Sequence, residues 1–138
     1  MKKKIYIAGK IGTEGEKELL EQVDELCKNL GFETFLPHRD VGIARDIGDV
    51  DRIFDGDINI GFDNADLVIA VLDGLHVGAG TAWELGYAYA KNIPAIGFKT
   101  DESVEDALDY LSSILIASMP IAKNIKELKG EIKKLAPN

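Results

Sequence analysis

Apolar residues along the chain form short uninterrupted runs separated by sets at helical spacing, and this pattern predicts the elements. The runs expected to be strands are 4–9, 33–37, 66–72, 93–98 and 119–122. The run at 66–72, "DLVIAVL", is apolar on both faces. Burial on both faces is typical of a strand at the centre of a parallel sheet.

Helices are expected between these runs. The first has a capping-box pattern, with Thr13 at the N-cap and Glu16 three residues later, and Gly31 is a natural stop at its end. Further helices are expected at 51–63, around Trp83, at 102–115 and after the cap Asn124, with a loop at 38–48. Strands and helices therefore alternate along the chain.

This alternation predicts an α/β fold, a three-layer sandwich in which right-handed crossovers connect parallel strands. The chain has 138 residues and no internal repeat or linker, so we expect one domain spanning 1–138. Ligands bind such sheets at the carboxyl ends of the strands. That rule selects three segments for the site: 9–13, 38–40 and 73–84.

The composition of the chain limits the kinds of molecule that it is expected to bind. The net charge of −8 argues against a nucleic-acid polymer or an acidic membrane surface, which require a basic footprint, but is compatible with a small anionic ligand. A single cysteine, Cys27, excludes an internal disulfide and a CxxC metal site. No apolar run approaches the roughly 18 residues of a membrane span, and the basic start is followed by too short an apolar stretch for a signal peptide. We expect a cytoplasmic protein.

Glu84 is a single carboxylate within the apolar stretch 78–92, "GAGTAWELGYAYAKN". The residues "TAWE" fit a capping box, with Thr81 at the N-cap and Glu84 at the third helical position, worth about 1 kcal/mol. A carboxylate in a first helical turn also stays ionised and could attack an anomeric carbon. Spacing alone favours the capping role, but the two roles do not exclude each other.

Other candidates lie in the two preceding loops. "GKIGTEGE" offers glycines, Lys10 and a helix N-terminus to an anion, and a plain capped turn fits it equally well. His38, Arg39 and Asp40 could bind a base or a phosphate, or form a salt bridge within the loop. The aspartates at 46–57 are expected to form a solvated acidic face. "GAGTAWELG" lacks the spacing of dinucleotide and P-loop motifs, so neither is expected.

The segments "DNADLVIAVLDG" and "GTAWELGYAYAKNIPAIGF" resemble the nucleoside 2-deoxyribosyltransferase family, which includes the 2′-deoxynucleoside 5′-monophosphate N-hydrolases. "KIYIAGKIG" matches the family's opening strand, and the resemblance covers nearly the whole chain. It implies a flavodoxin-like fold with a five-stranded parallel sheet of order 2-1-3-4-5. It also implies cleavage of an N-glycosidic bond without a metal or an organic cofactor.

The resemblance further implies residue roles. Glu84 would attack C1′ of the sugar and form a glycosyl-enzyme ester, which a second base or water then resolves. Tyr6 matches the tyrosine that orients the nucleophile, and Asp57 resembles the acid that protonates the leaving base. The spacing from Asp57 to Asp66 is one residue longer than the family pattern. Ser112 lies near a segment that reaches a neighbouring subunit's site, so a homodimer or larger assembly is implied.

One departure concerns Gly78, six residues before Glu84. The transferases usually carry an aspartate there that binds the sugar 5′-hydroxyl, whereas the monophosphate hydrolases carry a small hydroxyl residue. Glycine removes a clash with a 5′-phosphate, which Lys10, Thr13 and Ser112 could bind. The expected substrate-binding residues are Gly9, Lys10, Ile11, Thr13, His38, Arg39, Asp73, Gly78, Gly80 and Ser112.

The donor and the acceptor stay open at this point. "GTAWELG" is more similar to the transferases, and no arginine occupies the loop after the first strand. Transfer of the sugar to another base is therefore the first hypothesis. Hydrolysis of a nucleoside 5′-monophosphate is the second, and a non-catalytic nucleotide-binding module on the same fold is the third.

Overall fold

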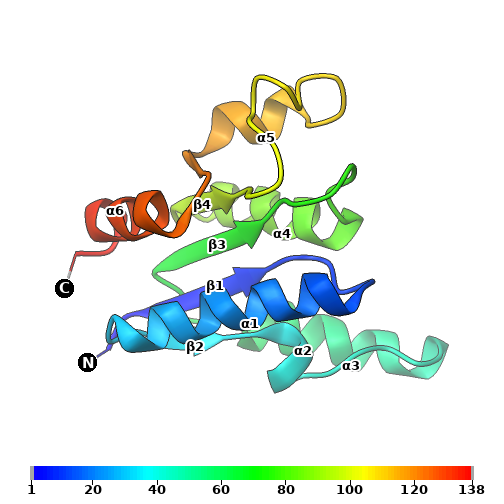
Figure 1. Cartoon of the computed structure of the whole chain (residues 1–138). Helices are drawn as coiled ribbons and strands as arrows, with labels where there is room; N and C mark the ends of the chain where they lie inside the picture. Colours follow the sequence, from blue (N-terminus) through cyan, green and yellow to red (C-terminus); the bar gives the residue numbers. More distant parts are fainter. Residues whose placement is uncertain (1, 138) are drawn as a thin grey trace.

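Five strands form one parallel sheet in the computed structural model of the chain, which describes residues 2–137 (Figure 1). They are β1 (Lys4–Ala8), β2 (Glu33–Phe35), β3 (Leu67–Val71), β4 (Ala95–Phe98) and β5 (Ile121–Ala122). Their order across the sheet is β2-β1-β3-β4-β5, and every neighbouring pair is parallel. The expected fold class and strand order are both confirmed.

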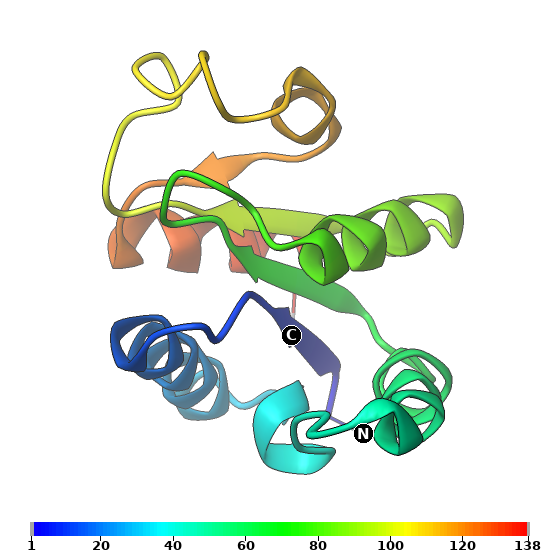
Figure 2. The same cartoon turned by 90° about the vertical axis from the view of Figure 1, so that its right-hand side faces the viewer.

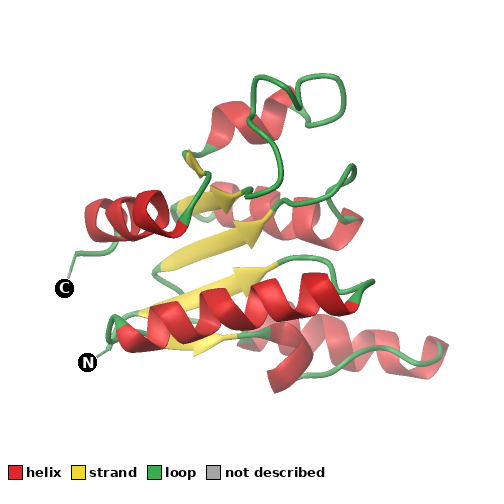
Figure 3. Cartoon of the chain, viewed as in Figure 1, coloured by secondary structure: helices red, strands yellow, loops and turns green. Residues whose placement is uncertain are grey.

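Helices cover both faces of this sheet. They are α1 (Glu14–Asn29), α2 (Pro37–Asp40), α3 (Val50–Phe54), α4 (Ala79–Ala90), α5 (Ser113–Ser118) and α6 (Ile125–Leu135), with a 3-10 turn η1 (Ile47–Asp49) and a π-helical segment η2 (Asp55–Ile60). Figure 2 shows α1 and α6 on one side of the sheet and α3 and α4 on the other, which gives three layers. Figure 3 shows how the loops join them. No helix within 2–137 is long and apolar enough to cross a membrane.

Alternate side chains of β1 enter two separate cores. Ile5 and Ile7 face α1 and α6, whereas Tyr6 and Ala8 face the α3 and α4 side. The first core is completed by Leu20, Val23, Cys27, Leu128 and Ile132. The second is completed by Ile58, Phe62, Leu85 and Ala88. Because strand side chains alternate, Tyr6 lies on the face that also carries Glu84's helix.

The predicted caps of α1 and α6 are confirmed. Thr13 Oγ1 accepts a hydrogen bond from the Glu16 amide at 3.1 Å, and the Glu16 carboxylate accepts one from the Thr13 amide at 2.9 Å. Asn124 accepts from the Glu127 amide at 2.9 Å. Gly31 follows α1 with a φ of 94°, a conformation that favours glycine. Both caps are local contacts, so spacing along the chain is enough to find them.

The predicted capping box in α4 is wrong. The helix begins at Ala79 with Gly78 as its N-cap, so Thr81 is a buried residue inside the first turn and Glu84 lies in the second turn. Gly78 packs closely on Lys10, since an added Cβ would lie 3.1 Å from the Cβ of Lys10. Glu84 is therefore not a helix cap.

The predicted helix at 102–115 is also wrong. That segment forms hydrogen-bonded turns, and α5 begins only at Ser113. Ser103 Oγ accepts from the Asp106 amide at the start of these turns, and Ser112 Oγ accepts from the Ile114 amide as the N-cap of α5, both at 3.2 Å. Ser112 therefore starts a separate short helix.

Two other expectations need smaller corrections. The loop expected at 38–48 contains most of the short helix α2 and the start of η1. The helix expected at 51–63 exists, but it begins at Val50, and its second half, η2, is wound as a π-helix. The change in winding affects Asp57, which lies within η2.

Candidate active site

Two adjoining cavities open at the carboxyl edge of the sheet, where the arrowheads of β1 and β3 point in Figure 1. The first, the apolar lobe, has a volume of about 510 Å³ and is lined by Val50, Ile53, Phe54, Ile58, Ala79 and Trp83. The second, the glycine-lined lobe, has a volume of about 250 Å³ and is lined by Gly9, Lys10, Ile11, His38, Gly42 and Gly78. Asp57, Glu84 and Gly80 line both lobes. We call the two lobes together the cleft.

Tyr6 orients the side chain of Glu84 through a hydrogen bond. The buried phenol of Tyr6 donates a hydrogen bond to Oε2 of Glu84. The Tyr6 ring is stacked between Phe62, at 4.1 Å between centroids, and Phe35, at 5.4 Å. Burial raises the pKa of Tyr6 far above its ordinary value, and the charge of Glu84 raises it further. The phenol therefore remains a hydrogen-bond donor at any physiological pH.

The Glu84 carboxyl titrates near neutrality. Burial raises its pKa from 4.5 to about 7; the Tyr6 hydrogen bond opposes this shift, and the negative charge of Asp57 adds to it. A substantial fraction of Glu84 is thus ionised at pH 7. Because Oε2 accepts the bond from Tyr6, the carboxylate is held in one orientation.

Asp57 differs from the other aspartates of its segment. It is half-buried, its Oδ1 is buried with no hydrogen-bond partner among residues 2–137, and burial raises its pKa from 3.8 to about 6. Asp46 and Asp49 instead accept backbone hydrogen bonds in exposed turns, and Asp55 accepts one from Asn59. The expected solvated acidic face therefore does not include Asp57.

Lys10 is the lysine that lines the glycine-lined lobe. Its Nζ lies 3.4 Å from a carboxylate oxygen of Glu16 and close to Gly74, where a Cβ would be 3.2 Å away. His38 lines the same lobe, with Nε2 4.0 Å from Glu21. Gly78 packs directly on Lys10, since an added Cβ there would lie 3.1 Å from the Lys10 Cβ.

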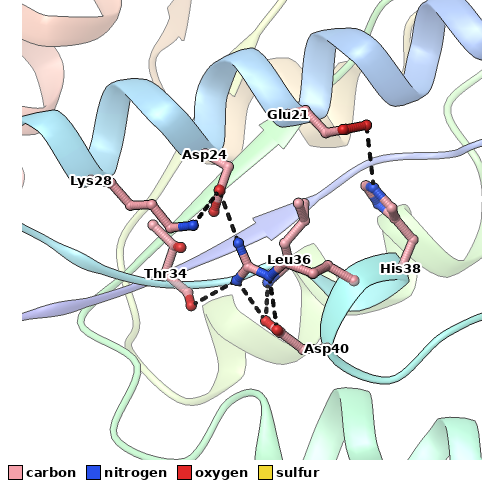
Figure 4. A network of polar contacts seen from close by, with 8 residues as sticks. Glu21, Asp24, Lys28, Thr34, Leu36, His38 and Asp40 are labelled. Carbon is pink, nitrogen blue, oxygen red and sulfur yellow. Dashed lines mark hydrogen bonds and ion pairs between the residues drawn. The ribbon is translucent and has the colours of Figure 1, made fainter.

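Arg39 does not line the cleft. Its guanidinium donates to Asp24 of α1 at 2.9 Å and to Asp40 at 2.8 Å, in the polar network of Figure 4. The Arg39 hydrogen bond, aided by the Leu36 amide, lowers the pKa of Asp40. The sequence left ligand binding and a salt bridge open for Arg39, and the structure shows the salt bridge. Arg39 thereby connects α1 to the segment that carries His38.

Three further expected residues lie outside the two lobes. Thr13 and Asp73 line a smaller cavity on the other side of Lys10, and the Thr13 hydroxyl is engaged in its cap. Asp73 accepts hydrogen bonds from the amide and the hydroxyl of Thr100. Ser112 caps α5. None of the three side chains lines the cleft of its own chain.

The apolar wall of the cleft was missed in the sequence. Phe54 and Trp83 are each about half exposed, 50% and 51%, and meet edge to face with centroids 5.8 Å apart. Trp83 also stacks on Tyr87 at 5.6 Å. The available signal was the position of Trp83 directly before Glu84, but an aromatic residue on a helix more often belongs to a core.

The described residues contain no cluster of three or more His, Cys, Asp or Glu suited to a metal ion.

Comparisons with known proteins identify a family and similar folds. A family model described as nucleoside 2-deoxyribosyltransferase matches residues 5–129. A conserved protein from Enterococcus faecalis V583 is similar in structure, with a TM-score of 0.70 and 26% identity over 97% of this chain and 99% of that chain. A 2-deoxyribosyltransferase from Bacillus psychrosaccharolyticus shares the fold, with a TM-score of 0.74 and 19% identity over 91% of this chain and 90% of that chain. No curated protein matches the chain.

Proposed function

The chain belongs to the nucleoside 2-deoxyribosyltransferase family, and from this premise we propose that it cleaves the N-glycosidic bond of (2′-deoxy)nucleosides or their 5′-monophosphates. One observation carries the proposal. Glu84, oriented by the Tyr6 phenol, and Asp57 line both lobes of the cleft, and both carboxyl groups titrate near neutrality. Enzymes that break a bond at an anomeric carbon commonly use a pair of carboxyl groups that flank that bond.

In the first half-reaction Glu84 is the nucleophile. Its ionised carboxylate attacks C1′, the C1′–N bond breaks, and the electron pair of that bond stays on the base. Asp57, when protonated, gives its proton to a ring nitrogen of the departing base, so that the base leaves uncharged. The products are a glycosyl ester on Glu84 and an ionised Asp57.

In the second half-reaction the ester is resolved. A nitrogen of an incoming base attacks C1′, the bond to Glu84 breaks, and the Asp57 carboxylate takes the proton that the incoming base loses. The net result is transfer of the sugar between bases with retained configuration. This transfer is the function that we propose first.

The two lobes suit the two halves of the substrate. The rings of Phe54 and Trp83, with Ile53, offer apolar surface to the faces of a base next to Asp57. In the other lobe, Lys10 offers a positive charge to the 5′ end of the sugar, and Gly78 places no carboxylate there. C1′ would then lie where the lobes meet, beside Glu84.

Hydrolysis of a nucleoside 5′-monophosphate is the second candidate. It is favoured by the absence of a carboxylate at Gly78 and by Lys10, because together they make the glycine-lined lobe compatible with a phosphate dianion. Water would replace the incoming base in the second half-reaction. The nucleophile and the acid would be the same residues.

Product analysis tests the proposal. The wild type and Glu84→Gln are incubated with deoxynucleosides and deoxynucleotides, with and without free adenine, and the products are separated by chromatography. Because Glu84 is not a helix cap, the Gln variant is expected to fold normally. A new deoxyadenosine product supports transfer, and free sugar or sugar phosphate without adenine supports hydrolysis. No base release by the wild type from any substrate contradicts the proposal and favours a non-catalytic binding module.

A further inference from the structure

The helix that carries Asp57 changes its winding at Asp55, two residues earlier. After α3 the backbone continues as the π-helical segment η2, and the Gly61 amide donates to the Gly56 carbonyl, five residues earlier, at 2.9 Å. A π turn takes up one residue more than an α turn and occurs frequently at functional sites.

Gly61 closes this turn against the site. A Cβ at position 61 would lie 2.4 Å from the Asp57 carbonyl oxygen, 2.6 Å from Cε1 of Phe35 and 2.8 Å from Cε2 of Tyr6. All of these separations are too short for real atoms, and two of the neighbours are a backbone atom and a fully buried ring. Only glycine lets η2 pack directly on Tyr6.

A second glycine anchors the other end of the turn. A Cβ at Gly56 would lie 2.7 Å from both γ-methyl groups of Val41. The turn is thus pressed between Val41 on one side and Tyr6 on the other. A side chain at Gly61 must displace the backbone that carries Asp57, and one at Gly56 must displace either that backbone or the Val41 side chain.

We propose that the π turn η2 and its closing residue Gly61 set the place of the Asp57 carboxyl relative to the Tyr6–Glu84 pair, so that Gly61 is a positioning residue for protonation of the leaving base. This inference rests on the proposed function. Gly61 contacts both the Asp57 carbonyl and the Tyr6 ring, so it links the position of Asp57 to that of Tyr6, which orients Glu84.

The inference predicts which step fails when the turn moves. Displacement of Asp57 weakens proton donation to the base, whereas Tyr6 and Glu84 can still deliver the nucleophile. A base that already carries a positive charge needs no proton, because the electron pair of the broken C1′–N bond makes it neutral. The deoxynucleoside 7-methyl-2′-deoxyguanosine has such a base, and 2′-deoxyinosine does not.

The test compares these two substrates in four proteins: wild type, Gly61→Ala, Asp57→Asn and the control Gly130→Ala. Gly130 lies in α6 with nothing within 4 Å of an added Cβ. We expect Asp57→Asn to lower kcat on 2′-deoxyinosine about a hundredfold and Gly61→Ala about tenfold or more. Both variants should stay within about threefold of wild type on 7-methyl-2′-deoxyguanosine, because general acid catalysis is not needed there. The control should match wild type on both.

Equal losses of Gly61→Ala on the two substrates would overturn the inference and leave the proposed function standing. Failure of the wild type to release base from either substrate would overturn this inference, and failure across the full panel of deoxynucleosides and deoxynucleotides would remove the proposed function as well. If Gly61→Ala does not fold, Gly56→Ala is compared with Gly56→Ala/Val41→Ala, which removes the methyl groups that the new side chain meets. Selective loss in the single variant with recovery in the double variant supports the inference, and unselective loss in both contradicts it.

Discussion

The phenol of Tyr6, in the first strand, donates a hydrogen bond to the carboxylate of Glu84, 78 residues later in α4. The bond joins two elements that pack on the same face of the sheet, and the Tyr6 ring is fixed by stacking on Phe62 and Phe35. The orientation of Glu84 therefore depends on the hydroxyl group, whereas the packing of the core depends on the ring.

Tyr6→Phe separates these two contributions. The ring and its stacking are kept, so the melting temperature should change by only a few degrees, while kcat should fall by about tenfold to a hundredfold, as for a lost hydrogen bond to a charged group. Steady-state kinetics and thermal unfolding measure the two effects. Undiminished turnover would remove Tyr6 from the site.

The pH dependence of turnover follows from two raised pKa values. The proposed reaction needs Glu84, with a pKa of about 7, ionised and Asp57, with a pKa of about 6, protonated, which is the less populated of the two singly protonated forms of the pair. Activity should therefore follow a bell with limbs near pH 6 and pH 7, which belong to the pair rather than to either residue. Asp57→Asn should remove one ionisation and leave a single limb. A plateau from pH 5 to pH 9 in the wild type would contradict these roles.

Stability should vary with pH in the opposite sense from that of an ordinary paired carboxylate. The pKa of Glu84 is raised in the folded protein, so the folded state binds its proton more tightly than the unfolded state does. The stabilisation is present below about pH 4.5 and is lost as the pH rises to about 7. Glu84→Gln should thus be more stable than wild type at pH 8 by about 1–3 kcal/mol, after allowance for partial exposure. Chemical denaturation at pH 5 and pH 8 measures this difference, and a less stable variant at pH 8 would contradict it.

A 5′-phosphate should be tolerated because of Gly78 and Lys10. Gly78→Asp places a carboxylate at a position whose Cβ lies 3.1 Å from the Lys10 Cβ, so it should lower kcat/KM for deoxynucleotides about tenfold more than for deoxynucleosides. Lys10→Gln should act in the same direction, and Lys17→Gln, which changes an exposed lysine of α1, should have no such effect. Much weaker turnover of deoxynucleotides than of deoxynucleosides by the wild type would count against the phosphate site.

Much of the fold was predictable because its signals are local. The apolar run of β3 marks a central strand, and the pattern of Thr13 and Glu16 marks the start of α1, because each depends on residues within a few positions. The start of α4 was not predictable in this way. Its N-cap is Gly78, which has no capping side chain and packs on Lys10, 68 positions away in the sequence, so no capping pattern marks it.

The site was predictable to a smaller extent. Resemblance to the family predicted roles for Tyr6, Asp57 and Glu84, and these roles stay predictions. Nothing in the sequence indicated the π turn that carries Asp57, which packs on Tyr6 through Gly61. Arg39 was among the expected ligand-binding residues. Its partner Asp24 lies 15 positions earlier on another element, so the sequence did not reveal that the two side chains are paired. Contacts between distant elements decided both cases.

The most direct test of the central claim is to trap the sugar on Glu84. The wild type is mixed with a deoxynucleoside in the absence of an acceptor base, quenched rapidly in acid, digested and mapped by mass spectrometry, with Glu84→Gln as the control. The proposed mechanism predicts one deoxyribosyl group on the peptide that contains Glu84 in the wild type and none in the variant. Base release by Glu84→Gln at the wild-type rate, or a sugar attached to another residue, would contradict it.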